Sequence, residues 1–157
     1  MSTLSETALR HPDTASLILE VHHRRIDEML DGVEIAADIG SWAEARALFT
    51  RLRGELEEHI RIEEQLMFPS FEAFMRMPGG PTSVMRAEHA EIARCLDAVE
   101  GSLDTQQLDG EAVDQLEALL ASHNAKEERV LYPLFERHAP PEAYGALLAE
   151  IRPLVEC

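Results

Sequence analysis

Apolar residues recur at three- and four-residue spacings along most of the chain, which is the pattern of amphipathic helices that bury one face. The pattern predicts four long helices, at about residues 13–38, 41–75, 82–101 and 111–138. The apolar side of the first is formed by Leu17, Ile18, Val21, Ile26, Met29, Leu30 and Val33. Val, Ile and Thr are not gathered into alternating runs, so strands have little support.

Breakers and caps separate these helices. Gly40 and Ser41 end the first helix, and Ser41 with Glu44 reads as a capping box that opens the second. The Pro-Gly-Gly-Pro segment at 78–81 is the strongest turn signal, after which Thr82 or Ser83 can cap the third helix, which is expected to end near Gly101.

Two long helices contain an internal proline, Pro69 and Pro133, where a bend is expected. Pro140 and Pro141 stop the fourth helix, and residues 142–152 are expected to form a short fifth helix. The prediction is therefore an all-α chain of one domain over 1–157. Its polar arm covers 1–12, and an antiparallel up-down-up-down four-helix bundle covers about 13–138.

One sequence motif occurs twice, at residues 59–72 and again 64 residues later at 123–136. Both copies read His-x-x-x-Glu-Glu-x, two apolar residues, an aromatic residue, Pro, x, Phe and Glu. Since a His and a Glu four apart share a helix face, His59 with Glu63 and His123 with Glu127 each offer an imidazole beside a carboxylate.

The first and third helices also echo each other. His23 and His89 are each followed by Ile at +3, Leu at +7, Asp at +8 and Val at +10. The echo selects His23 over its neighbour His22, which corresponds to Glu88 and is interpreted as a flanking residue. The opposite assignment of His22 and His23 stays open as the minority interpretation.

Six residues in a two-fold arrangement predict a metal site: His23, His59, Glu63, His89, His123 and Glu127. Two buried carboxylates need a positive counter-charge, because burial of an unpaired charge costs several kcal/mol. Imidazole and carboxylate without thiolate suit iron, manganese or zinc, and two bridging glutamates favour a dinuclear centre. Glu64, Glu88 and Glu128 either orient the imidazoles or simply face solvent, and both readings stay open.

The net charge of the chain limits the classes of binding partner that are expected. A net charge of −16, with 30 acidic against 14 basic residues, repels nucleic acid and anionic lipid, so neither is an expected partner. The chain has two cysteines, Cys95 and Cys157, so no disulfide framework is expected, and Cys95 is interpreted as a small buried residue. No signal peptide or membrane span is recognised, and a cytoplasmic location is expected.

The twin His-x-x-x-Glu-Glu segments, with a lone His on each preceding helix, resemble the hemerythrin-like (HHE cation-binding) family over about residues 17–136. The resemblance implies an oxo- or hydroxo-bridged di-iron centre inside a four-helix bundle, with manganese and zinc as open alternatives. It further implies that His23 and His59 hold one iron, His89 and His123 hold the other, and Glu63 and Glu127 bridge them.

Within the family, residues 63–69 and 80–89 look like the repair-of-iron-centres proteins, which act on iron–sulfur clusters after nitric oxide or oxidative stress. Two departures stand out. The paired-cysteine domain of that group has no counterpart here, and the further His of the oxygen carriers, four residues after His89, is Ala93. Simple reversible oxygen carriage is therefore not the favoured expectation.

Three functions follow as hypotheses. The first is a di-iron protein that binds or responds to O2, nitric oxide or peroxide, or handles iron in cluster repair. The second is a di-iron enzyme that reduces nitric oxide or peroxide, and the third is a metal-stabilised structural or interaction module. Whether the chain turns over a substrate and whether it forms a homodimer are left open by the sequence.

Overall fold

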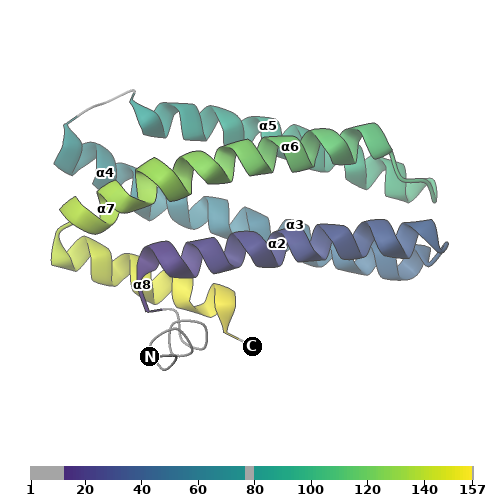
Figure 1. Ribbon diagram of the computed structural model, residues 1–157, viewed down its shortest axis with the longest axis horizontal. Coiled ribbons are helices and arrows are strands. Elements are labelled where there is room, and N and C mark those ends of the chain that lie inside the picture. The colour runs from purple at the N-terminus through teal and green to yellow at the C-terminus, as the bar shows by residue number, and fades with distance from the viewer. Residues whose placement is uncertain (1–12, 77–79, 157) are drawn as a thin grey trace, which may run out of the picture.

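The computed structural model describes residues 13–76 and 80–156, and over these residues the chain consists of helices joined by short connections, with no strand. The predicted all-α class is therefore confirmed. Long helical segments lie side by side, and a shorter C-terminal helix lies along one side of them (Figure 1). The expected arm at 1–12, residues 77–79 with the first half of the predicted turn at 78–81, and Cys157 lie outside the described residues.

The first two helices are α2 (Ala15–Asp38) and α3 (Trp42–Ile62), which pack against each other. Thr14 caps α2, its hydroxyl accepting the Leu17 N–H at 3.2 Å. The predicted capping box at Ser41 is wrong in its mechanism: Ser41 precedes α3 as expected, but its side chain makes no capping hydrogen bond. The backbone makes the turn instead, and Gly40 takes a positive φ of 77°.

The helix does not simply bend at Pro69 but widens before it. A π-helical turn, η1 (Glu63–Met67), follows α3 and leads into α4 (Phe68–Met75). Proline has no N–H and its ring collides with the carbonyl four residues back, so the regular ladder cannot continue. The Phe68 N–H accordingly bonds to the Glu63 carbonyl five residues back.

The helix that carries the second copy of the motif widens in the same way. After α6 (Gly110–Lys126) comes the π-helical turn η2 (Glu127–Leu131), and then α7 (Tyr132–His138) with Pro133 in its first turn. Both π-helical turns therefore begin at the glutamate of a His-x-x-x-Glu motif. Single π-helical turns are rare and often accompany functional sites.

The third long helix, α5 (Pro81–Asp104), departs from expectation at both ends. It starts with Pro81 at its first position, and neither Thr82 nor Ser83 caps it; the buried Thr82 hydroxyl donates to Glu72 Oε2 at 2.6 Å instead. This bond ties α5 to α4. Gly101 lies inside the helix, which ends three residues later, because a glycine does not terminate a helix whose other residues keep packing.

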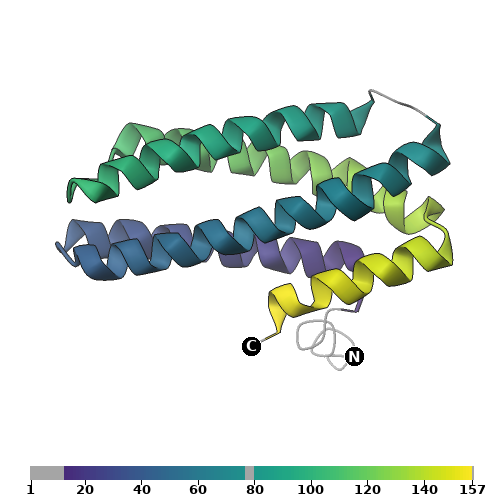
Figure 2. The ribbon, with the colours of Figure 1, turned by 180° about the vertical axis from the view of Figure 1, so that it is seen from behind.

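The C-terminal helix, α8 (Pro141–Val155), is longer than predicted and begins at Pro141, which occupies a first-turn position where no N–H is needed. It packs on α2, α3 and η1. Figure 2 shows the opposite side, where α3 runs through η1 into α4 across the bundle. None of the helices in the described part of the chain is long and apolar enough to cross a membrane.

Two apolar clusters fill the bundle. One contains Ile26, Leu56, Ile92 and Leu120, and the other contains Leu19, Ile62, Met85 and Leu131. On each of the four long segments, the predicted site residues lie between a residue of one cluster and a residue of the other. A polar layer therefore crosses an otherwise apolar core. Cys95 packs against the first cluster but is only partly buried, less than the small buried residue that was expected.

Candidate metal centre

The six predicted metal ligands converge in this polar layer, and all six are buried. Their exposed fractions run from 0% for Glu63 and Glu127 to 5% for His23. Each comes from a different long helix or from the π-helical turn that continues it: His23 from α2, His59 from α3, Glu63 from η1, His89 from α5, His123 from α6 and Glu127 from η2.

The six side chains form two overlapping groups with metal-ligand spacing. Glu63, His89, His123 and Glu127 make one group, and His23, His59 and Glu127 make the other. We call the first position A and the second position B.

Both carboxylates reach both positions. At position A, Glu63 Oε1 lies 3.3 Å from His89 Nε2, and Glu127 Oε1 lies 3.3 Å from His123 Nε2. At position B, Glu63 Oε2 lies 3.3 Å from His59 Nε2, and Glu127 Oε1 lies 3.2 Å from His23 Nε2. Glu63 therefore reaches the two positions with its two oxygens, whereas Glu127 reaches both with Oε1.

The outer nitrogen of three imidazoles contacts a carboxylate from another helix. His23 Nδ1 lies 2.7 Å from Glu128, His89 Nδ1 lies 2.8 Å from Glu64, and His123 Nδ1 lies 2.9 Å from Glu88. These glutamates could either orient the imidazoles or simply face solvent, and the structure favours the first alternative. Such contacts fix the ring orientation and leave the inner Nε2 free to donate a lone pair.

The fourth imidazole is held by another histidine. His59 Nδ1 lies 2.8 Å from His22 Nδ1, and His22 Nε2 lies 3.1 Å from Glu55 Oε1. His22 thus does for His59 what Glu88 does for His123, in agreement with the echo that aligned these two positions. His22 is itself fully buried, its ring nitrogens contact His59 and Glu55, and it belongs to neither group of possible ligands, so the minority assignment gains no support.

The proton assignment follows from these contacts. An Nδ1–H that donates to a carboxylate leaves a neutral imidazole with an acceptor at Nε2. His89 Nε2 and His123 Nε2 nevertheless face each other at 3.1 Å, and both are 3.3 Å from a carboxylate oxygen. Facing acceptors repel unless a positive charge lies between them, so the inner face of the layer requires protons or metal ions.

Two further atoms point to the same need. Glu63 Oε1 and Glu127 Oε2 are buried without any hydrogen-bond partner. Leaving a buried carboxylate oxygen unpaired is costly, and metal coordination removes that cost. The donor set, four imidazoles and two carboxylates that reach both positions, fits two metal ions.

In the metal-free chain, protons provide the missing positive charge. Burial opposes charge on His23, but Glu127 and Glu128 outweigh it and raise its pKa to about 10. Burial likewise opposes charge on His123, but Glu127 raises its pKa to about 9. Burial and the neighbouring His59 lower the pKa of His22 to about 4, which keeps His22 neutral between His59 and Glu55.

Tyr132 also lies in this layer, and the sequence analysis did not predict it. The Tyr132 hydroxyl donates to Glu63 Oε2 at 2.6 Å and lies 3.0 Å from Glu127 Oε1, 3.2 Å from His23 Nε2 and 3.3 Å from His59 Nε2. On a regular helix Tyr132, nine residues after His123, would point about 180° away from it. The π-helical turn adds one residue to the turn and rotates Tyr132 inward. The proline next to it was the available signal.

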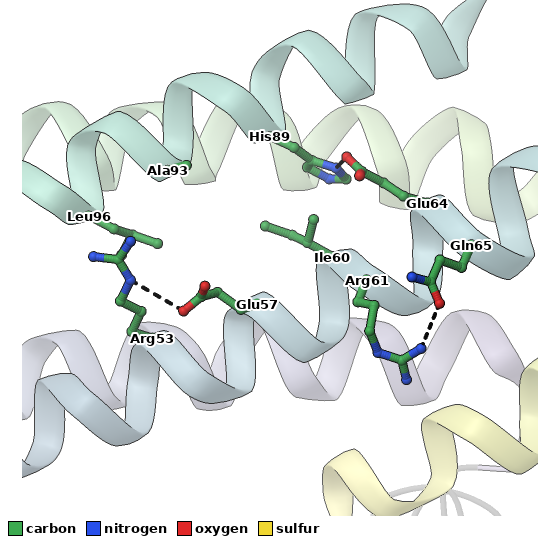
Figure 3. Close-up of a pocket in the computed structure, with 9 residues that line it drawn as sticks. All are labelled: Arg53, Glu57, Ile60, Arg61, Glu64, Gln65, His89, Ala93 and Leu96. Atoms are coloured by element: carbon green, nitrogen blue, oxygen red, sulfur yellow. Dashed lines mark hydrogen bonds and ion pairs between the residues drawn. The ribbon is translucent and has the colours of Figure 1, made fainter.

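A cavity of about 300 Å³ reaches the position A side of the layer between α3 and α5. Its lining consists of Arg53, Glu57, Ile60, Arg61, Glu64, Gln65, His89, Ala93 and Leu96. In Figure 3, His89 and Glu64 approach each other from opposite helices at one end, and the small side chain of Ala93 lies on the His89 side.

Comparison with known proteins agrees with this geometry. The model of the Hemerythrin HHE cation binding domain family matches residues 14–135. The iron-sulfur cluster repair protein YtfE of Salmonella paratyphi B (strain ATCC BAA-1250 / SPB7) is 32% identical over 95 residues, and so is YtfE of Salmonella newport (strain SL254). Each of these matches covers 54% of this chain and 43% of the relative's own length. No solved structure matches the chain significantly.

Proposed function

The chain belongs to the hemerythrin HHE cation-binding family, and from that premise we propose that its buried layer holds two iron ions. His89 and His123 would hold the ion at position A, and His23 and His59 would hold the ion at position B. Glu63 and Glu127 would bridge the two. We take the helices to form the antiparallel up-down-up-down bundle of the family.

The observation that carries the proposal is the set of unpaired buried acceptors. Two buried carboxylate oxygens, Glu63 Oε1 and Glu127 Oε2, lack a hydrogen-bond partner, and two Nε2 atoms face each other at 3.1 Å. Imidazole and carboxylate ligands without thiolate suit iron, manganese or zinc. Membership in the family and similarity to proteins named for iron–sulfur cluster repair favour iron over the other two.

The bound ions would supply redox chemistry and coordination sites for a small ligand. The chain's own residues do the rest. Glu64, Glu88, Glu128 and His22 hold the four imidazoles in place, and the two apolar clusters keep water away from both sides of the layer.

The ligand we propose is a small diatomic molecule or peroxide, and the cavity beside His89 is its route to position A. Ala93 lines this cavity and leaves it open. Ala93→Leu is expected to fill the space and slow nitric oxide binding to the iron-loaded chain, with unchanged iron content. Stopped-flow absorption measures the rate, and Ala98→Leu on the same helix is the control. An unchanged rate in Ala93→Leu would reject this route.

The physiological task we propose is handling iron during recovery of iron–sulfur clusters from nitric oxide or oxidative stress. The support is the similarity of this chain to proteins named for iron-sulfur cluster repair. Because the match spans less than half of their length, the activity of the whole relatives is a hypothesis here. Incubation of the iron-loaded chain with a nitric-oxide-damaged cluster protein tests it, with recovery of cluster absorption as the readout and the metal-free chain as the control.

Two alternatives are separated from this proposal by experiment. A di-iron enzyme would consume nitric oxide or peroxide through many turnovers when a reductant is present, whereas a binding protein would stop after one equivalent per centre. A structural module would lose stability in Glu63→Gln and Glu127→Gln while nitric oxide chemistry stayed unchanged.

A further inference from the structure

The contacts around the metal layer obey a two-fold symmetry between the hairpin of α2 and α3 and the hairpin of α5 and α6. Phe68 stacks on His89 with ring centroids 5.6 Å apart, and Tyr132 stacks on His23 at 5.8 Å. Both aromatic residues follow a π-helical turn and precede a proline. Phe68 and Tyr132 are therefore the same structural position in the two halves.

The two halves differ chemically at this position, because one has phenylalanine and the other has tyrosine. Phe68 presents only carbon to position A, whereas Tyr132 places an oxygen at position B. A second difference lies beside His59, where His22 stands in the place that Glu88 takes beside His123. Two carboxylates, Glu64 and Glu88, touch the imidazoles of position A, but only Glu128 touches those of position B. Position B therefore lacks one anion that position A has.

The Tyr132 oxygen has the spacing of a ligand. Right-angle neighbours in a coordination shell with bonds of about 2.1 Å lie about 3 Å apart. The Tyr132 oxygen lies 2.6, 3.0, 3.2 and 3.3 Å from Glu63, Glu127, His23 and His59, the four side chains that surround position B. The His23–Glu127 and His59–Glu63 atom pairs are 3.2 and 3.3 Å apart, so the contacts of the Tyr132 oxygen and those between the side chains around it all lie between 2.6 and 3.3 Å.

We propose that Tyr132 is a protein ligand of the metal at position B, binding iron(III) through its phenolate oxygen. The inference rests on the proposed iron centre. Position B then has five protein ligands and position A has four, so the exogenous ligand binds at position A, where the cavity beside His89 and Ala93 opens. The phenol proton leaves to solvent when the cation binds, as protons leave other ligands on metal binding, and the phenolate supplies the anion that position B otherwise lacks.

The test is the visible spectrum of the full chain, loaded anaerobically with ferrous iron and then oxidised in air. We expect a phenolate-to-iron(III) charge-transfer band with tyrosine ring modes in its resonance Raman spectrum. Tyr132→Phe should lose the band and the modes completely while its iron content per chain is unchanged. Tyr144→Phe is the matched control and should keep both, because the Tyr144 hydroxyl accepts the Ala15 N–H outside the metal layer.

The chain contains two tyrosines, so the wild-type spectrum alone decides the main point even where a variant folds poorly. Full iron loading without tyrosine ring modes overturns the assignment of Tyr132 and leaves the di-iron proposal standing. Tyrosine modes that survive in Tyr132→Phe also overturn it. Failure of the wild type to bind iron overturns both the proposed function and this inference.

Discussion

At the scale of single residues, the sequence contained most of the centre. Four histidines and two glutamates could be predicted because two repeats, 64 and 66 residues apart, align them, and His-x-x-x-Glu spacing puts both side chains on one helix face. Tyr132 could not be predicted because regular helical spacing points it away. Glu55 was also missed, since its partner His22 lies on another helix and the pair leaves no pattern in the sequence.

Residues that touch only the outer nitrogen of an imidazole are expected to tune metal affinity. Glu88→Ala removes the acceptor for His123 Nδ1 and should weaken iron binding about 10- to 100-fold. Competition with a chelator of known affinity measures the change. Glu91→Ala, exposed on the same helix and paired with Arg94, is the control and should have no effect. Equal affinities in the two variants would show that Glu88 does not support the centre.

At the scale of the helices, periodicity predicted four long helices but not how they end or change pitch. Helix-capping propensity alone does not reveal that the Ser41 side chain makes no capping hydrogen bond, or that the Thr82 hydroxyl donates to Glu72 instead of capping α5. Both outcomes depend on neighbours that the fold brings close. The two π-helical turns depend on Pro69 and Pro133, which the sequence marked only as bends.

The caps give a sharp comparison of stability. Asp109 caps α6 by accepting the Ala112 N–H at 3.1 Å, so Asp109→Ala should lower the free energy of unfolding by about 1 kcal/mol. Ser41→Ala should change it by less than about 0.5 kcal/mol, because that side chain makes no capping bond. Urea unfolding measures both. A larger loss in Ser41→Ala than in Asp109→Ala would contradict the observed caps.

An acidic contact between α2 and α6 predicts a pH dependence. A hydrogen bond to Glu117, together with burial, raises the pKa of Glu34 from an ordinary 4.5 to about 7. The folded chain therefore binds this proton more tightly than the unfolded chain does. The resulting stabilisation is fully present below the ordinary pKa of 4.5 and is lost as the pH rises through the folded-state pKa of about 7.

The matching measurement is thermal unfolding of wild type and Glu34→Gln across this pH range. Wild type should lose stability between about pH 4.5 and pH 7 relative to the variant, which removes the shared proton. Glu28→Gln, on the same helix, is the control and should follow wild type. Parallel curves for wild type and Glu34→Gln would show that the proton is not shared.

At the scale of the whole molecule, a charged layer is held between two apolar clusters. Such a layer is unfavourable unless cations balance it, so folding and metal binding should be coupled. At free iron about 100-fold above its dissociation constant, binding adds about 2.7 kcal/mol to the free energy of unfolding. Removal of iron by a chelator should lower the melting temperature of wild type and leave that of the Glu63→Gln, Glu127→Gln double variant nearly unchanged. Equal melting temperatures for wild type with and without iron would contradict this coupling.

The central claim is that the six side chains of the buried layer hold two iron ions. The most direct measurement is the metal content per chain of protein purified from iron-replete cells, recorded together with its visible absorption spectrum. We expect two irons per chain and the absorption bands of a bridged diferric centre. One zinc per chain and a colourless protein would contradict the claim.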